Sequence, residues 1–328
     1  MCDVHNADLS QPAGGPRQAE IARLVQNLNS LEEGERTVTK LMAHGRLAIE
    51  PLRLFLFEGK PSVIYQPRRW AVEALAAIGA KEVLIEYLKW KKEIPDPAVR
   101  FGEEPVENAA ARALAAWRTD EVFETMLHVS RRRSQLGFVE ALGQFRRAEA
   151  IPYFIRALED DICRSAAEES LRKLGAGAAP ALLEAALTRL PSPEEERPSS
   201  VRRRIGVLRL LPEIELTQEF WQQLRPLISD SHTGIAIAIS NIATSVGDHQ
   251  DKVAAVERLL EILPSADWYD QGEIETCLVG LYRAGRDLLE SELARRNALP
   301  DEQQVMDRAL RTLLRVKRQV DATERPAS

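Results

Sequence analysis

Residues 68–79 read RRWAVEALAAIG, and close variants of this stretch recur along the chain. The variants are ENAAARALAAW at residues 107–117, GFVEALGQF at residues 137–145 and RSAAEESLRKLG at residues 164–175. Each variant has a leucine that aligns with Leu75, at intervals of roughly 30 to 40 residues, which is a spacing typical of helical-hairpin repeats. The stretch therefore marks one repeated unit.

We call the residue that aligns with Leu75 the anchor of its repeat. Weaker copies extend the series, so that the anchors are Leu41, Leu75, Leu114, Leu142, Leu171, Leu211, Ile242, Leu281 and Leu313. Four residues before each anchor stands an uncharged and mostly small residue, as in Ala71, Ala110 and Ala167. Positions four apart share one face of a helix, so the pattern predicts a buried, closely packed helix face in every repeat.

A second helix is predicted after each anchor helix. Pro51, Pro152 and Pro180 follow the end of an anchor pattern, and proline fits the first turn of a helix because its missing N–H would have no partner there. Alternation of apolar and polar residues, which would indicate strands, is absent over any useful length. The sequence therefore predicts an all-α fold made of helical hairpins.

The chain resembles the HEAT-like repeat family, and in particular its short phycobilisome-lyase type. Residues 158–175, LEDDICRSAAEESLRKLG, carry an acidic pair, then Arg164, then the small-residue helix, then a glycine. Arg68 and Arg204 occupy the same place as Arg164, where the family forms a ladder of Arg–acid pairs between neighbouring repeats. Other residues replace that arginine elsewhere: Glu107, Gln135, Ile235, Ile274 and Met306. The resemblance implies an α-α superhelix, a solenoid of about eight helical-hairpin repeats plus caps.

The predicted organisation is a single array with short tails. Residues 17–320 form the solenoid, between a disordered N-terminal tail at 1–16 and a disordered C-terminal tail at 321–328. Irregular insertions are expected near residues 93–105 and 188–200, where prolines and charged residues gather.

Composition limits where in the cell the chain is expected to function. Its 328 residues carry a net charge of −6, and 45% of them are hydrophobic. No apolar run reaches the length of a membrane span, so no membrane association is expected. Three widely spaced cysteines without a CxxC motif favour a reducing, cytoplasmic location. Whether the protein forms oligomers is left open.

Catalytic, cofactor-binding and metal-binding residues are not predicted. The sequence contains no P-loop, HExxH or GxSxG motif. The five histidines are never followed by glutamate, whereas deoxyhypusine hydroxylase, an iron enzyme on this repeat fold, needs several His-Glu pairs for its metals. We therefore expect a protein that is not an enzyme.

Two arginine clusters form a candidate basic edge. They consist of Arg131, Arg132, Arg133, Arg202, Arg203 and Arg204. Each cluster is expected to open an anchor helix, where positive charge opposes the helix dipole, so a phosphate-bearing or acidic partner would explain it. The alternative is an arginine-rich surface with no ligand.

Four rings on the second helices are candidate partner-binding residues, namely Tyr87, Trp90, Tyr153 and Trp221. Other apolar residues suffice for the buried stripe of these helices, which leaves the rings for an interface. The alternative is a thicker stripe that buries them between repeats.

The function expected from these features is a non-catalytic scaffold or adaptor. It would bind a protein partner, of unknown identity, through a concave face lined by the second helices. The alternatives are a bilin-lyase-like enzyme or chaperone, suggested by the resemblance, and a nucleic-acid binder that uses the arginine-rich edge. The net negative charge makes nucleic acid the less favoured partner.

Overall fold

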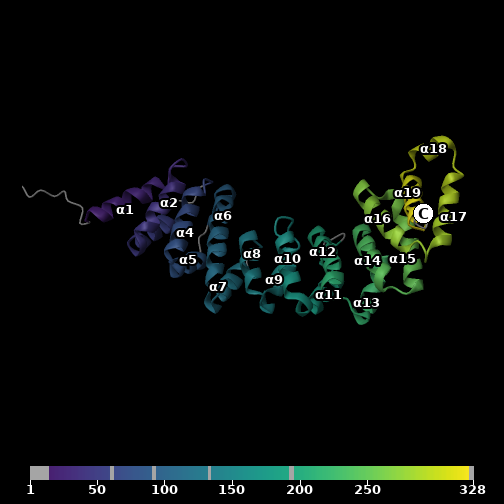
Figure 1. Cartoon of the computed structure of the whole chain (residues 1–328), viewed down its shortest axis with the longest axis horizontal. Coiled ribbons are helices and arrows are strands. Elements are labelled where there is room, and N and C mark those ends of the chain that lie inside the picture. Colours follow the sequence, from purple (N-terminus) through teal and green to yellow (C-terminus); the bar gives the residue numbers. More distant parts are fainter. Residues whose placement is uncertain (1–14, 60–62, 91–93, 132–133, 192–195, 325–328) are drawn as a thin grey trace, which may run out of the picture. The chain divides into compact units, whose positions relative to one another are not determined.

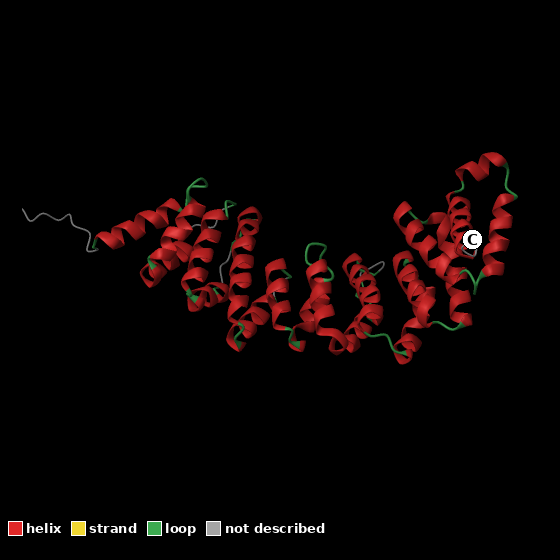
Figure 2. Ribbon diagram, in the orientation of Figure 1, coloured by secondary structure: helices red, strands yellow, loops and turns green. Residues whose placement is uncertain are grey.

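The computed structural model describes residues 15–59, 63–90, 94–131, 134–191 and 196–324. Helices joined by short loops make up this part of the chain, and no strand occurs in it (Figure 2). The predicted all-α class is therefore confirmed. None of the helices in the described ranges is long and apolar enough to cross a membrane.

The chain divides into two compact units between Phe145 and Arg146. Figure 1 follows the helices of both units in chain order. Those of the first unit are α1 (Pro16–Asn27), α2 (Gly34–Ala43), α3 (Ile49–Glu58), α4 (Gln66–Ile78), α5 (Lys81–Lys89), α6 (Pro97–Leu114), α7 (Asp120–Ser130) and α8 (Leu136–Phe145).

The second unit continues in the same manner. Its helices are α9 (Ile151–Ala157), α10 (Arg164–Leu174), α11 (Ala179–Leu187), α12 (Pro198–Ile214), α13 (Gln218–Leu224), α14 (Thr233–Val246), α15 (His249–Ile262), α16 (Trp268–Leu281), α17 (Arg286–Asn297), α18 (Asp301–Met306) and α19 (Arg308–Glu324). Short 3₁₀ turns join several of these helices, for example Gly175–Ala178 between α10 and α11.

Packing within each unit follows the alternation that the sequence predicts. In the first unit α4 contacts α2 and α6, and α6 contacts α8, while α5 contacts α3 and α7. In the second unit the same rule links α10, α12, α14 and α16, while α11 contacts α9 and α13; α16 contacts α19, which follows it by three helices. Helices therefore pack against the next but one in the chain, as consecutive hairpins do when they stack.

The predicted core face is confirmed. All nine anchors are buried, and so are all nine residues four positions before them, from Thr37 to Ala309. Pro51, Pro152 and Pro180 lie in the first turns of α3, α9 and α11, as expected. Five of the nine residues four positions before an anchor are alanine, which leaves room for a neighbouring helix to approach closely.

Two boundaries differ from those predicted. The interval near 93–105 is helical from Pro97 onward, because Asp96 caps α6 by accepting a hydrogen bond from the N–H of Ala98 and Pro97 opens its first turn. At the C-terminal end α19 continues to Glu324, beyond the expected end of the ordered region at residue 320. Residues 1–14 and 325–328 of the two predicted tails lie outside the described residues.

The predicted ladder forms at two of its three arginines. Arg68 on α4 donates to the carbonyl of Leu56 in the last turn of α3, at 2.8 and 3.2 Å, and pairs with Glu103 on α6. Arg204 on α12 donates to the carbonyl of Ala186 in the last turn of α11 at 2.8 Å. It also pairs with an acid ahead of α14, as described below.

The remaining ladder positions are filled differently. Arg164 turns to Asp161 in its own loop, and both side chains are partly exposed. Where Glu107 and Gln135 replace the arginine, the amide of Gln135 donates to the Glu107 carboxylate at 2.7 Å. An arginine that reaches both neighbours is therefore present once in each unit among the described residues.

Candidate interaction groove

The surface of the second unit is hollowed over α14. Two adjoining recesses, of about 500 and about 360 Å³, lie between the walls formed by α12 and α16. We call the two recesses together the α14 groove. Its floor includes Ile237, Ala238 and Asn241, and its walls include Arg209 and Glu273.

Small side chains on α14 create the hollow. Gly234 and Ala238 lie one helical turn apart and face the groove, so the floor stays below the level of the longer side chains on α12 and α16. Above this floor, the Arg209 guanidinium on α12 binds the Glu273 carboxylate on α16 at 2.5 Å. Arg209 and Glu273 line both recesses, so this ion pair lies where the two recesses meet.

The smaller recess ends in an acid beside two exposed rings. The carboxylate of Asp270 makes no hydrogen bond or ion pair with any described residue. Burial, followed by the nearby charges of Asp267 and Glu273, raises its pKa above the ordinary value. Next to it, Trp268 is 81% exposed and Tyr269 is 52% exposed, with their ring centroids 6.0 Å apart.

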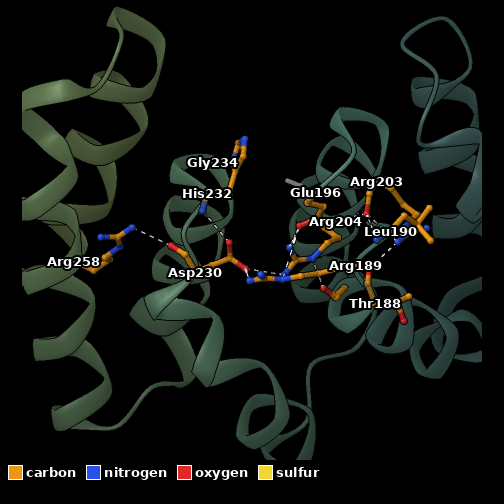
Figure 3. A network of polar contacts seen from close by, with 12 residues as sticks. Thr188, Arg189, Leu190, Glu196, Arg203, Arg204, Asp230, His232, Gly234 and Arg258 are labelled. Atoms are coloured by element: carbon orange, nitrogen blue, oxygen red, sulfur yellow. Dashed lines mark hydrogen bonds and ion pairs between the residues drawn. The ribbon is translucent and has the colours of Figure 1, made fainter. Parts of the chain in front are cut away.

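A buried network fixes the start of α14 (Figure 3). Asp230, which lies in the loop before α14, accepts hydrogen bonds from Arg204 at 2.9 Å, from Arg189 at 2.7 Å and from the N–H of His232 at 2.9 Å. Its backbone carbonyl accepts a hydrogen bond from Arg258 on α15 at 3.0 Å. The loop that leads to the groove is thereby attached to three neighbouring hairpins.

His232 connects this network to the groove. Its Nδ1 accepts a hydrogen bond from the N–H of Gly234 at 3.2 Å, so the side chain caps α14, and it also lines the smaller recess. Although burial opposes ionisation of Asp230, the His232 N–H and the Arg204 guanidinium hold the pKa of this carboxyl below its ordinary value. Asp230 therefore carries a negative charge that Arg204 neutralises.

The first unit has a smaller polar cavity of about 160 Å³. Glu103 is buried in its wall, where it binds Arg68 and accepts a hydrogen bond from the hydroxyl of Tyr87. Burial and the Glu103 charge raise the pKa of Tyr87 well above its ordinary value. The charged groups of this cavity are thus largely satisfied by one another.

Three of the four predicted partner-binding rings are not available to a partner. Tyr87 and Tyr153 are 4% exposed, and Trp221 is completely buried, so the expectation that they are exposed is wrong. Trp221 donates from its indole nitrogen to Asp251 on α15 at 2.8 Å, which places the ring between hairpins. Only Trp90, at 37% exposed, keeps a surface position, and it packs against Phe57.

The predicted basic edge is also corrected in part. Arg203 and Arg204 are buried, and their guanidinium groups bind Glu159 and Asp230 respectively. Arg202 donates to the carbonyl of Glu159 at 3.2 Å. These arginines stabilise contacts between hairpins, because their partners Glu159 and Asp230 lie in loops outside α12. Arg131 is exposed, and Arg132 and Arg133 lie outside the described residues.

The groove residues bear little on catalysis. Cys277 is buried in the larger recess, and burial raises the pKa of its thiol to about 12, so it is a poor nucleophile. Within the described ranges, no group of three or more His, Cys, Asp or Glu side chains is placed to hold a metal ion. The absence of an enzymatic activity stays a prediction.

Sequence reasoning missed the groove. It placed the binding face on the second helices, whereas the two recesses of the α14 groove are lined mainly by the first helices of the hairpins, α10, α12, α14 and α16. One signal was available: the run GIAIAISNIA at residues 234–243 places two small residues, Gly234 and Ala238, one helical turn apart on the face that lines the recesses. A second signal was the Trp268–Tyr269 pair directly after a capping aspartate.

Comparison with known proteins adds no functional assignment. No family model matches the chain, and no curated protein matches it in sequence. Among solved structures, the crystal structure of an engineered protein aligns with 92% of this chain and 99% of its own, at 13% identity and a TM-score of 0.32. A likeness at that level shows neither a shared fold nor a shared function.

Proposed function

We propose that the chain is a non-catalytic, HEAT-like helical-repeat scaffold that binds a protein partner in the α14 groove. The observation that carries this proposal is the pair of adjoining recesses over α14, which together offer apolar floor, charged walls and exposed rings. Helical-repeat proteins use such extended hollows to bind other proteins. The stacking of alternate helices in each unit supports the solenoid arrangement that this proposal assumes.

The chemistry of the groove favours a polypeptide over a nucleic acid. Arginines Arg164, Arg202 and Arg209 face the smaller recess, but Glu168, Asp270 and Glu273 face it as well. A phosphate backbone needs an excess of positive charge, and neither this recess nor the net charge of −6 supplies one. A polypeptide can match such a mixed surface with side chains of both signs.

The test is to fill the groove without disturbing the core. Asn241 is exposed on the groove floor, so Asn241→Trp should keep the fold while its indole occupies the larger recess. The matched control is Gln223→Trp, because Gln223 is exposed on α13 in the same unit and lines neither recess. Both variants should show the helical circular dichroism and melting temperature of the wild type.

Binding is measured by quantitative affinity purification and cross-linking mass spectrometry in the native host. We expect a partner that cross-links to α12, α14 or α16 in the wild type and in Gln223→Trp, and that is lost from Asn241→Trp. Equal recovery of all partners by the two tryptophan variants would reject the groove as the binding site.

A further inference from the structure

We propose that the Asp270 end of the α14 groove receives the guanidinium or ammonium group of an arginine or lysine on an extended segment of the partner protein. This inference rests on the proposed function, because it names the chemistry that the groove selects. Three observations carry it: an acid without a partner, basic groups that are already engaged, and two exposed rings beside the acid.

Asp270 is the acid in this recess that the protein leaves unmatched. Glu273 is bound by Arg209, and Glu168 lies 3.7 Å from the Arg172 guanidinium. Asp270 has no hydrogen-bond or ion-pair partner among the described residues, although it is partly buried in the wall of a recess. A position near the start of α16 favours a carboxylate through the helix dipole, but it does not account for one that faces a hollow next to two other acids.

The arginines that face the same recess have partners of their own. Arg164 pairs with Asp161, and Arg202 donates to the Glu159 carbonyl and lies 3.9 Å from Asp161. An anionic ligand in this recess would face the Asp270 carboxylate, whereas a cationic ligand would meet the one carboxylate of the recess that has no partner among the described residues, so charge complementarity at Asp270 selects a positive group.

The exposed rings complete a site for a long basic side chain. Tyr269 lines the recess and Trp268 packs edge-on against it, with both rings largely in solvent. Aromatic faces attract ammonium and guanidinium groups, and they also cover the methylene stem that carries such groups. Tryptophan and tyrosine at the rim of a hollow are the residues that most often anchor a protein interface.

The site has an expected pH dependence. The groups around the Asp270 carboxylate are Asp267 and Glu273, which raise its pKa, and His232 and Arg209, which oppose this rise. Arg164, Glu168 and Arg202 also line the recess. A bound cation favours the ionised form of Asp270, so affinity should fall as the pH drops through the raised pKa, and Asp270→Asn should lose that part of the pH dependence.

The probe is a library of random 12-residue peptides displayed on phage and selected on the full-length chain. Peptides that also bind Asn241→Trp are removed, so those that remain need an open groove. We expect these groove peptides to share an arginine or lysine. Asp270→Asn should weaken their binding at least about ten-fold at neutral pH, with circular dichroism and melting temperature unchanged.

A charge exchange provides the decisive arm. Replacing the shared basic residue of the peptide by glutamate should abolish binding to the wild type and restore it, at least in part, on Asp270→Lys. Groove peptides that carry no basic residue, or that bind Asp270→Asn as well as the wild type, would overturn this inference and leave the proposed function standing. Selected peptides that all bind Asn241→Trp and Asp270→Asn as well as they bind the wild type, or a selection without enrichment, would count against both.

Discussion

Arg68 and Arg204 show how a single side chain can join three hairpins. Each donates to a carbonyl in the last turn of the preceding second helix, where no helical N–H is available, and each binds an acid that belongs to the following hairpin. A buried guanidinium is costly to desolvate, so these contacts stabilise the fold only as complete sets. Removing one member leaves a buried charge without its partner.

Asp230→Asn tests this dependence. Asparagine keeps the shape but loses the charge that faces Arg204 and Arg189, so the free energy of unfolding at pH 7 should fall by about 3 kcal/mol in urea titrations. Arg189→Gln is the control: its side chain is 52% exposed, so its loss should cost less than about 1 kcal/mol. Equal stability of Asp230→Asn and wild type would contradict the role of the network.

The same pair of proteins reports on pH. The pKa of Asp230 is lower in the folded protein than its ordinary value, so the folded state is favoured by deprotonation of this group. Its contribution is fully present above an ordinary aspartate pKa of about 3.9 and is lost as the pH falls through the lower folded value. The stability difference between wild type and Asp230→Asn should therefore stay constant from pH 7 to about 4 and shrink below that. A difference that grew on acidification would show the opposite sign.

The residue four positions after an anchor often adopts a positive φ, and glycine marks this conformation in only some of the repeats. Gly79 and Gly175, four residues after their anchors, have φ of +87° and +62°. The equivalent positions after Leu114 and Leu142 hold Arg118 and Arg146, which adopt φ of +48° and +52° despite their side chains. A positive φ at this position is thus kept even where glycine is absent.

Arg118→Gly should consequently stabilise the protein. A Cβ in the left-handed region destabilises the folded state by about 1–2 kcal/mol. Glycine removes this steric cost but loses more backbone entropy on folding, so the free energy of unfolding should rise by about 0.5–1 kcal/mol. Ala116→Gly, two residues earlier and outside that region, should instead lose about 0.5–1 kcal/mol. Thermal unfolding of the two variants should shift the midpoint in opposite directions.

Close contact between α6 and α8 depends on one glycine. A Cβ at Gly137 would lie 2.6 Å from the Cα and from the backbone oxygen of Asn108, so Gly137→Ala should cost about 1–3 kcal/mol by overpacking. Gly272 in α16 has open space around it, and Gly272→Ala should be neutral or stabilising by up to about 1 kcal/mol. Denaturant midpoints that move alike for both variants would show that α6 and α8 are not in tight contact.

At the scale of elements, the periodicity of the sequence predicted the helices and their buried faces, but it did not predict which other residues the neighbouring hairpins bury. It located the anchor helices because a residue such as Leu171 and its neighbour Ala167 face the same way whatever surrounds them. It could not place Trp221 or Arg203, because their burial is decided by the neighbouring hairpin, which local sequence does not identify. The groove was missed for the same reason, since its floor and walls come from hairpins that are distant in sequence.

Considered as a whole, the molecule has two units, each with its own buried anchors and its own complete arginine set. Neighbouring-hairpin contacts supply the stability of such arrangements, so a run of hairpins can fold without the rest of the chain. The prediction of one continuous array from residue 17 to residue 320 concerns both units together and stays a prediction.

Expression of residues 146–328 alone tests the independence of the second unit. We expect a helical circular dichroism spectrum and a cooperative thermal transition, because the α14 groove, the Asp230 network and the anchors of this unit all lie within the fragment. Asp230→Asn should lower the midpoint of the fragment as it does in the full-length chain. A fragment without helical structure would show that the unit depends on residues before Arg146.

The Arg204 contacts also impose an order on biosynthesis. The ribosome releases α11 first, then α12 with Arg204, and only later the loop with Asp230, so the carbonyl at the end of α11 acquires its polar partner only after 18 further residues have emerged. Until Asp230 emerges, the Arg204 guanidinium has only Glu196 as an acidic partner, which it binds at 2.6 Å, and the hairpin is incomplete. The α10–α11 hairpin is thus secured by its successor, and a translational pause that holds Asp230 in the exit tunnel after Arg204 has emerged would prolong the interval in which the nascent chain most needs protection by chaperones.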